Sequence, residues 1–200
     1  MTVAALYVDP AGIYAGKADC WGPDRDARTY DGPHPVVAHP PCTRWCRLAG
    51  LVEARWGHKK GDDGGTFAAA LASVRRWGGV LEHPAYTDAF KAYDIPAPPW
   101  SGWQRTLDGG WVAHVEQGRY GHLAKKATWL YAFGIDDPPA LRWGRMADTE
   151  TEAHYGTSWC ANKTKAGGEA RQRVGKAAAA TPPEFAELLL SIAAVAGGGS

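Results

Sequence analysis

The sequence predicts a single α/β domain with helices flanking a sheet, and three neighbouring stretches carry that prediction. The apolar run at 36–39 is followed by two prolines, which indicates a short buried strand. The alanine-rich run at 65–77 has the spacing of an amphipathic helix and is stopped by two glycines. GVLEHP at 79–84 indicates the next strand. Strand, helix and strand in this order form a βαβ unit, so we expect a parallel sheet with a site at the carboxyl ends of its strands.

Further elements are expected on both sides of this unit. Apolar runs indicate three more strands, at 3–9, 111–121 and 127–135. Segments rich in polar, glycine or proline residues are expected to be loops, at 10–34, 43–65 and 94–110. The run at 181–196 predicts a closing helix, with Thr181 as its cap and prolines in its first turn.

Length and composition limit what the molecule can be. The chain has 200 residues, of which 45% are hydrophobic, and this suits one domain, 1–196, with a sizeable core. Residues 197–200, GGGS, are expected to be a flexible linker or tail. The net charge is only +1, so no overall basic field exists to drive sequence-blind binding along duplex DNA. Any contact with nucleic acid must be local.

The compartment follows from the amino terminus and the cysteines. MTVAALYVDP lacks a charged leader region, and no run approaches the roughly 18 apolar residues of a membrane span. We therefore expect a cytoplasmic protein without membrane contact. The four cysteines, at positions 20, 42, 46 and 160, would stay reduced there, which favours free thiols, a metal site or a catalytic group over disulfides.

Cys42 directly follows Pro40 and Pro41, where the strand opens into a loop. A free cysteine is often only a small buried hydrophobic residue. A rigid strand-to-loop turn also holds a nucleophile well, and Arg44 and Arg47 are nearby cations that could lower the pKa of the thiol. Cys42 is therefore a candidate nucleophile.

Glu82 lies in VLEHP, after two apolar residues and before His83 and a proline. A buried carboxylate at the end of an interior strand is costly unless it is hydrogen-bonded or takes part in chemistry. It is either a satisfied structural acid or an acid whose pKa is raised by burial and which can donate to a ring nitrogen. His83 would point to the opposite face and is expected to be structural.

A polar cluster surrounds two glycines in VEQGRYGHLAKKATW, residues 115–129. Its polar members are Glu116, Gln117, Arg119, His122, Lys125 and Lys126. One interpretation is a solvated hairpin. The other is a reader of a base or phosphate, because glutamine and arginine present paired hydrogen-bonding groups.

Taken in order, PPC, then LEHP after a helix, then EQGRYGH and KKATWL resemble the catalytic half of the DNA cytosine-5 methyltransferases. That family carries Pro-Cys, a Glu-Asn-Val strand end and a Gln-x-Arg-x-Arg strand in the same order. The pattern is more closely similar to short phage-encoded methyltransferase-like proteins. The resemblance covers about residues 34–145 and implies a shortened Rossmann-like fold. His83 replaces the family's asparagine, and Gly121 replaces its second arginine.

The resemblance implies a role for each matching residue. Cys42 would be the nucleophile that adds to C6 of a pyrimidine, in DNA or in a nucleotide. Glu82 would hold or protonate N3 of the ring. Arg119, with Gln117 behind it, would orient the base. We further expect substrate contacts from His122, Lys125 and Arg44.

The resemblance also implies S-adenosylmethionine as the methyl donor. In the family, a strand, a glycine-rich turn, an acidic ribose contact and another strand hold this cofactor before the Pro-Cys loop. Only 33 positions separate Asp9 from Cys42 in this chain, so one βαβ unit is missing. Asp9, Gly12 and Gly16 are the candidates for a reduced cofactor loop. A second subunit, in a homodimer, could complete it.

Zinc binding is a separate possibility. His39, Cys42 and Cys46 form H-x-x-C-x-x-x-C, and His34 or Cys20 could complete a structural site. The cysteine spacing is one residue longer than in the zinc deaminases. Basic residues farther along the chain could contact phosphates or form a solvated connector: Lys163, Lys165, Arg171, Arg173 and Lys176.

The function expected from these features is a pyrimidine-modifying enzyme that methylates C5 of cytosine through a covalent cysteine adduct. The alternative is a nucleotide-binding or nucleic-acid-binding protein of phage origin that has no turnover and interferes with a host defence. Tryptophans in the loop at 94–111 and the hairpin cations would suffice for that second role.

Overall fold

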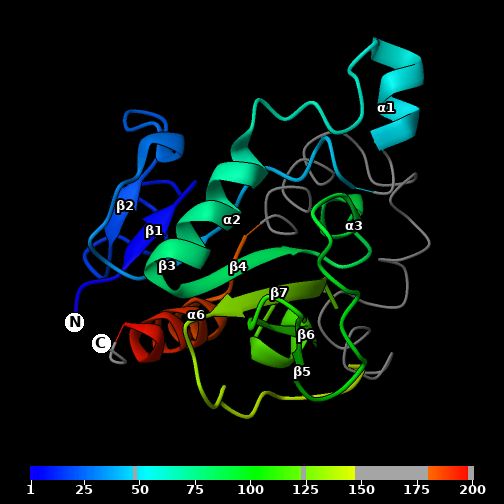
Figure 1. Ribbon diagram of the computed structural model, residues 1–200. Coiled ribbons are helices and arrows are strands. Elements are labelled where there is room, and N and C mark those ends of the chain that lie inside the picture. The colour runs from blue at the N-terminus through cyan, green and yellow to red at the C-terminus, as the bar shows by residue number, and fades with distance from the viewer. Residues whose placement is uncertain (47–48, 123–124, 147–179, 198–200) are drawn as a thin grey trace.

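The computed structural model describes residues 1–46, 49–122, 125–146 and 180–197 of the chain. Seven strands form one mixed sheet with helices on both faces (Figure 1), so the α/β class is confirmed. Their order across the sheet is β2-β1-β3-β4-β7-β6-β5. In chain order the strands are β1 (Ala4–Leu6), β2 (Asp19–Trp21), β3 (Val36–Ala38), β4 (Gly79–Pro84), β5 (Gln104–Arg105), β6 (Trp111–Glu116) and β7 (Ala127–Phe133).

The first four strands of that order run parallel, and α2 (Thr66–Trp77) connects β3 to β4. The predicted βαβ unit is therefore confirmed. Val36 lies opposite Gly79, and Ala38 lies opposite Leu81. Gly79 has a φ of 124°, and a Cβ there would lie 2.0 Å from the carbonyl oxygen of Val36. Only glycine permits this close strand pairing.

The other half of the sheet is antiparallel. β7 lies between β4 and β6 and is antiparallel to both, while β5 pairs with the outer edge of β6. β6 and β7 form a hairpin closed by the 3-10 helix η2 (Gln117–Tyr120). The two strands predicted here are confirmed, but the first is shorter than expected because η2 takes the place of its last residues.

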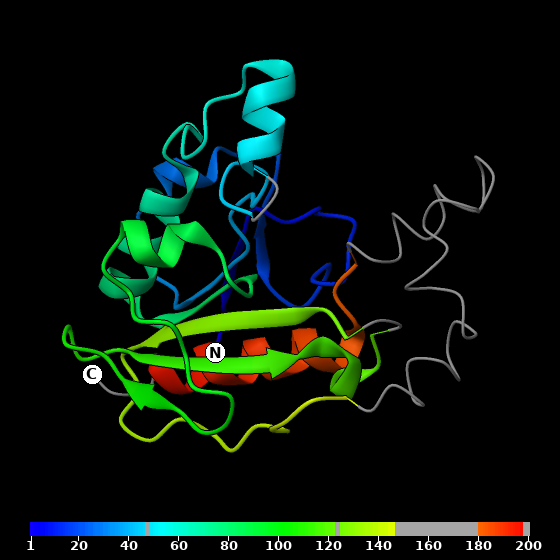
Figure 2. The ribbon, with the colours of Figure 1, turned by 90° about the vertical axis from the view of Figure 1, so that its right-hand side faces the viewer.

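Helices cover both faces of the sheet. On one face α2 packs with the 3-10 helix η1 (Ala27–Thr29), and on the other α6 (Pro183–Ala196) runs along the strands (Figure 2). Val37 packs in the cluster on the α6 side, whereas its two neighbours in β3 pack in the cluster on the α2 side. This two-sided burial explains why β3 is apolar at every position. Within the described ranges, no helix has the length and apolarity needed to cross a membrane.

Four elements form inside segments that were expected to be loops. β2 and η1 lie in 10–34, α1 (Ala49–Trp56) in 43–65, and β5 in 94–110. β2 and β5 are edge strands with half-buried or exposed residues, so their structure comes from pairing with a neighbour and leaves no hydrophobic pattern in the sequence.

The starts of α3 and α6 are held in different ways. α3 (Asp88–Ala92) begins at Thr87, whose hydroxyl oxygen accepts a hydrogen bond from the backbone nitrogen of Ala89 at 3.2 Å. The closing helix was expected to use Thr181 as its cap. Its cap is instead Pro182, which makes no side-chain cap bond, so this helix is held by packing of its apolar face rather than by capping.

Candidate functional site

A cavity of about 760 Å³ opens at the carboxyl ends of β1, β3 and β4. Cys42 and Glu82 both line it, which confirms their expected placement at one edge of the sheet. The cavity wall also includes residues that follow β1 and β3 or precede β7, among them Asp9, Gly12, Tyr14, His39 and Lys126. The mouth of a parallel sheet is where such folds usually bind ligands.

His39 and Tyr14 form a hydrogen-bonded chain with Glu82. Nδ1 of His39 lies 3.1 Å from Oε2 of Glu82, and Nε2 lies 2.7 Å from the hydroxyl oxygen of Tyr14. A neutral imidazole can donate to the carboxylate through Nδ1 and accept the tyrosine O–H at Nε2, whereas an imidazolium donates through both nitrogens. The chain can therefore carry a proton beside the cavity.

The second carboxylate oxygen of Glu82 is held by Gln117. Nε2 of Gln117 donates to Oε1 of Glu82 at 2.9 Å and also lies 3.0 Å from the hydroxyl oxygen of Thr128. Gln117 is fully buried, and the side chain of Glu82 is only 12% exposed. With both oxygens held, the carboxylate has a fixed orientation at the cavity wall.

These partners decide the ionisation of Glu82. Burial is the largest influence on its carboxyl group and by itself would raise the pKa. The hydrogen bond and charge of His39, together with the charge of Lys126, outweigh burial, so the pKa of Glu82 is lowered. Of the two alternatives for Glu82, the acid with a raised pKa is therefore wrong, because the sequence does not show which partner accompanies the buried carboxyl group. Near neutral pH Glu82 is a carboxylate and accepts hydrogen bonds.

The thiol of Cys42 has the opposite tendency. Burial raises the pKa of Cys42, and the neighbouring Cys46 and Glu82 add to that effect. The charge of Lys126 lowers the pKa of the thiol without reversing the shift. Most Cys42 side chains are therefore protonated at neutral pH, and Lys126 is the group that favours the thiolate.

Lys126 supplies the cation of this cavity. Its Nζ donates to the carbonyl oxygen of Ala180 at 2.7 Å, and burial lowers its pKa against the opposing charges of Glu82 and Cys42. Sequence reasoning chose its neighbour Lys125 for substrate contact, and Lys125 does not line the cavity. The two lysines precede β7, so the choice between them depends on how the strand is placed, which the sequence alone does not reveal.

The other expected polar contacts lie away from the cavity. Arg119 belongs to η2, and its Nη1 donates to the carbonyl oxygen of Arg145 at 3.3 Å. Arg119, Arg44 and His122 are absent from the cavity lining, so their expected contact with the same ring as Cys42 is not seen in this geometry. Arg47 lies outside the described residues. Gln117 thus reaches Glu82 itself rather than standing behind Arg119.

Two of the three residues expected to hold a cofactor reach the cavity. Asp9 and Gly12 line it, and Gly16 does not. The side-chain carboxylate of Asp9 accepts a hydrogen bond from the backbone nitrogen of Ala11 at 2.9 Å. The backbone carbonyl oxygen of Asp9 accepts another from the backbone nitrogen of Gly12, also at 2.9 Å. A Cβ at Gly12 would lie 3.0 Å from that carbonyl oxygen. The chain after β1 therefore makes a tight turn at the cavity mouth.

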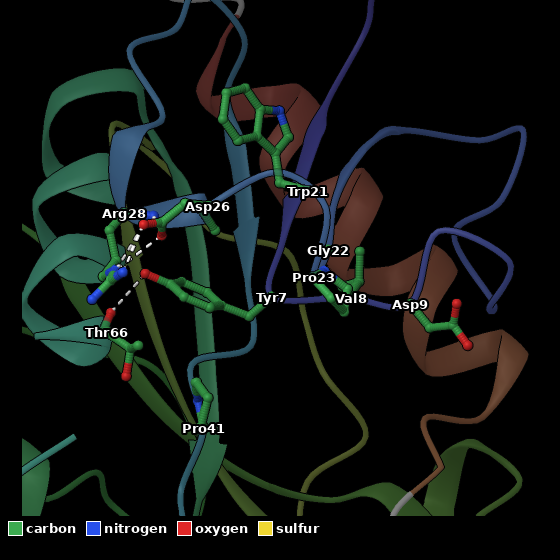
Figure 3. A pocket seen from close by; sticks show the side chains of 11 residues that line it. Tyr7, Val8, Asp9, Trp21, Gly22, Pro23, Asp26, Arg28, Pro41 and Thr66 are labelled. Atoms are coloured by element: carbon green, nitrogen blue, oxygen red, sulfur yellow. Dashed lines mark hydrogen bonds and ion pairs between the residues drawn. The ribbon is translucent and has the colours of Figure 1, made fainter. Parts of the chain in front are cut away.

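A second cavity of about 880 Å³ adjoins the first. The two cavities share four lining residues: Tyr7, Val8, Asp9 and Pro41. The Tyr7 hydroxyl donates to the carbonyl oxygen of Thr66 at 3.0 Å (Figure 3). On the same side of Tyr7, Asp26 and Arg28 form a forked ion pair, while Asp9 lies on the other side (Figure 3). Sequence reasoning did not single out this wall.

Trp21 contributes an aromatic wall to the second cavity. The guanidinium of Arg25 lies over this ring, 3.9 Å from its centroid, and Tyr30 packs edge-on at 5.1 Å. The indole nitrogen donates to Asp19 at 2.9 Å. Aromatic and apolar walls suit a flat ligand. Asp26 is neutralised by Arg28, which also lines the cavity, so Asp9 is the carboxylate that can face a positively charged group.

The alternative of a zinc site has no counterpart in the described part of the chain. Among those residues, no group of three or more His, Cys, Asp or Glu side chains is placed to hold a metal ion. His39 instead bonds Tyr14 and Glu82. Cys160 and the basic residues from Lys163 to Lys176 lie outside the described ranges.

Searches with this chain find no matching family model, no matching curated protein and no matching solved structure. Its function must therefore be inferred from the geometry of its own cavities.

Proposed function

We propose that this chain is a pyrimidine-modifying enzyme with a shortened methyltransferase-like fold, which bonds Sγ of Cys42 to C6 of cytosine and so directs a methyl group to C5. One observation carries the proposal: Cys42 shares a cavity, at the carboxyl ends of parallel strands, with a carboxylate whose two oxygens are both held. A nucleophilic thiol and a group that stabilises the ring nitrogen are what addition to a pyrimidine requires.

The bonding changes assign a task to each cavity residue. As the Sγ–C6 bond forms, the C5–C6 double bond opens and negative charge spreads to N3, which takes up a proton. Glu82 accepts the hydrogen bond of that N3–H, and His39 is placed to hold the proton before it moves. After C5 has gained its methyl group, the C5 proton is lost to water, the Sγ–C6 bond breaks, and the N3 proton returns through Glu82 to His39, which restores the aromatic ring and the thiolate.

Lys126 prepares the nucleophile in this scheme. Only the thiolate attacks C6, and burial keeps Cys42 largely protonated. An ammonium group in the same cavity stabilises the thiolate that forms when the thiol loses its proton. Lys126 therefore takes the role that the sequence alone suggested for Arg44 and Arg47.

The adjoining cavity fits a methyl donor of the S-adenosylmethionine type. Such a donor, when bound, supplies an electrophilic methyl group to C5. Tyr7 and Trp21 offer flat walls to a nucleoside, and Asp9 lines both cavities, where its carboxylate can face a sulfonium centre. The residues present thus fit a flat, positively charged group, even though Gly16 lies outside both linings.

A nucleotide-binding protein without turnover is the second candidate. The raised pKa of Cys42 favours it, because a protonated thiol is a poor nucleophile. In that role the cavity would hold a ring through Glu82 and Lys126, with no bond to sulfur.

Transfer of a labelled methyl group from S-adenosylmethionine to cytosine-containing nucleic acid or nucleotides separates the candidates. An enzyme loses transfer in Cys42→Ala and keeps it in Cys46→Ala, a matched control in the same loop that does not line the cavity. A protein that binds nucleotide equally well with and without Cys42, and transfers no methyl group in either form, is a binder. Full transfer by Cys42→Ala would exclude the covalent route.

A further inference from the structure

We propose that an aromatic shelf beside the cavity, formed by Tyr86, Trp100, His114 and Trp129, stacks a base of single-stranded nucleic acid that flanks the reacting nucleotide. This inference rests on the proposed function and narrows its substrate from any cytosine compound to a polymer with unstacked bases. Trp100 belongs to the loop at 94–111, whose tryptophans the sequence suggested for nucleotide binding, whereas Tyr86, His114 and Trp129 had no expected role.

The shelf presents two large rings to solvent. Tyr86 is 43% exposed and Trp100 is 50% exposed, and their ring centroids lie 6.4 Å apart. Folded chains normally bury most of the surface of such side chains. Two exposed rings that contact one another and share a floor provide a surface on which a flat heterocycle can stack.

Buried rings fix the floor of the shelf. Trp100 lies over His114 with centroids 4.5 Å apart and planes inclined by 37°, and Tyr86 packs on Trp129 at 5.4 Å. The indole N–H of Trp129 donates to Nδ1 of His114 at 3.1 Å. Because an indole can only donate, Nδ1 is the acceptor and the imidazole has one fixed tautomer and orientation. The exposed rings therefore rest on a preorganised base, which lowers the entropy lost on binding.

The shelf starts where the cavity ends. Pro84, the last residue of β4, lines the cavity, and Tyr86 follows two residues later. Between them, the backbone nitrogen of Ala85 donates to the carbonyl oxygen of Ala127 at 2.9 Å, next to Lys126 of the cavity wall. The floor of the shelf projects to the α2 face of the sheet, whereas Glu82 projects to the α6 face. A single strand with one base in the cavity would therefore pass over the end of β4, at Pro84 and Tyr86, to place a neighbouring base on the shelf.

The charge at the shelf complements a phosphate backbone. The guanidinium of Arg145 lies 5.0 Å from the ring centroid of Trp100, and it makes no ion pair within the described part of the chain. Its carbonyl oxygen accepts a hydrogen bond from Arg119, which brings a second cation to the same segment. The net charge of the whole chain is only +1, which is too little to hold a long duplex. Two neighbouring cations, Arg145 and Arg119, are enough to contact the phosphates of a single strand.

The test is the affinity of the full chain for a labelled single strand of about ten nucleotides containing cytosine, measured by fluorescence anisotropy. Trp100→Ala should weaken binding at least about five-fold, and Trp100→Phe, which keeps a ring, should recover most of that loss. Arg145→Gln should reduce the slope of log affinity against log salt by about one.

Trp56→Ala is the matched control. Trp56 is also exposed, at 59%, and Arg55 also lies over its ring, at 5.0 Å, but it belongs to α1, far from β5 and β6 (Figure 1). Its loss should leave the affinity unchanged. Equal weakening by Trp56→Ala and Trp100→Ala, or none by Trp100→Ala, would overturn the proposal, as would tighter binding of a duplex that does not depend on Trp100.

The outcomes also distinguish failure of the shelf proposal from failure of the proposed enzymatic function. Binding that depends on Trp100 without any methyl transfer would leave the shelf standing and remove the proposed function. Methyl transfer to a free nucleotide, with no effect of Trp100→Ala on nucleic-acid binding, would remove the shelf and leave the enzyme.

Discussion

Nδ1 of His39 lies 3.1 Å from Oε2 of Glu82, and this contact joins the residue that follows β3 to the middle of β4 at the mouth of the sheet. It makes Glu82 a hydrogen-bond acceptor rather than an acid, because it lowers the pKa of a buried carboxyl group that burial alone would raise. Tyr14 extends the contact on the far side of the imidazole. The chemistry of the cavity depends on this chain.

Removal of His39 should destabilise the fold in a pH-dependent way. His39→Ala leaves a buried carboxylate without its main partner and should cost about 2 kcal/mol at pH 7, measured by urea unfolding. Because the pKa of Glu82 in the folded chain lies below its ordinary value of 4.5, the pair stabilises the fold above that pH and loses its effect as the pH falls further. The difference between wild type and variant should therefore shrink below pH 4.5, and a constant difference would contradict the pairing.

His83 should impose a second pH dependence in a different window. It is fully buried against Phe67, with ring centroids 5.3 Å apart, and burial lowers its pKa from 6.5 to about 4. The unfolded chain therefore binds a proton that the folded chain does not, so stability is complete above pH 6.5 and falls as the pH drops towards 4, by about 3 kcal/mol. His83→Phe should remove most of this slope in urea unfolding at pH 7 and pH 5, whereas His58→Gln, an exposed control, should keep it.

Removing the charge of Lys126 and removing the charge of Glu82 should shift the pH at which Cys42 becomes reactive in opposite directions. Lys126→Met removes the charge that lowers the pKa of the thiol, so alkylation by iodoacetamide should require a higher pH. Glu82→Gln removes a charge that raises it, so alkylation should begin at a lower pH. The measurement is the alkylation rate at Cys42 against pH, by mass spectrometry. Identical profiles for both variants would show that neither group acts on the thiol.

Asp63 should hold the start of α2 and the loop before it. One carboxylate oxygen accepts hydrogen bonds from the indole nitrogen of Trp45 and the backbone nitrogen of Phe67, both at 2.8 Å, and the other accepts from Gly65 at 2.9 Å. Asp63→Ala should cost about 2 kcal/mol in thermal or urea unfolding because it leaves several donors unpaired. Asp62→Ala, at an exposed neighbouring position, should cost almost nothing. Equal costs would mean that these bonds add no stability.

The elements that sequence reasoning predicted correctly are those with a local signal. β3 and β4 are apolar runs with a proline or glycine at their ends, and α2 between them ends at glycine, so each could be recognised in isolation. β2 and β5 carry no such signal because edge pairing with another strand forms them. Cys42 and Glu82 could be predicted for the same reason, because each lies near the carboxyl end of a strand that the sequence shows by itself.

The remainder of the site depends on relationships between distant segments. Tyr14, His39 and Glu82 lie on three separate parts of the chain, and only the fold brings them into one hydrogen-bonded line. The strand expected at 111–121 ends early in η2, so its side chains no longer alternate, and Arg119 turns towards Arg145 instead of the cavity. Lys125 and Lys126 are adjacent in the sequence, and only the position of the backbone before β7 determines that Lys126, and not Lys125, lines the cavity.

The central claim is a bond between Cys42 and C6 of a pyrimidine, and trapping that bond tests it most directly. A ring of 2-pyrimidinone lacks the electron-donating amino group of cytosine, so it adds thiols readily and requires no methyl donor. The protein would be incubated with a single strand, and separately with a nucleotide, carrying this base, and its intact mass measured. We predict an adduct of one substrate per chain that maps to Cys42, persists in Cys46→Ser and is absent in Cys42→Ser. No adduct at either substrate, or an adduct that survives Cys42→Ser, would contradict the covalent mechanism.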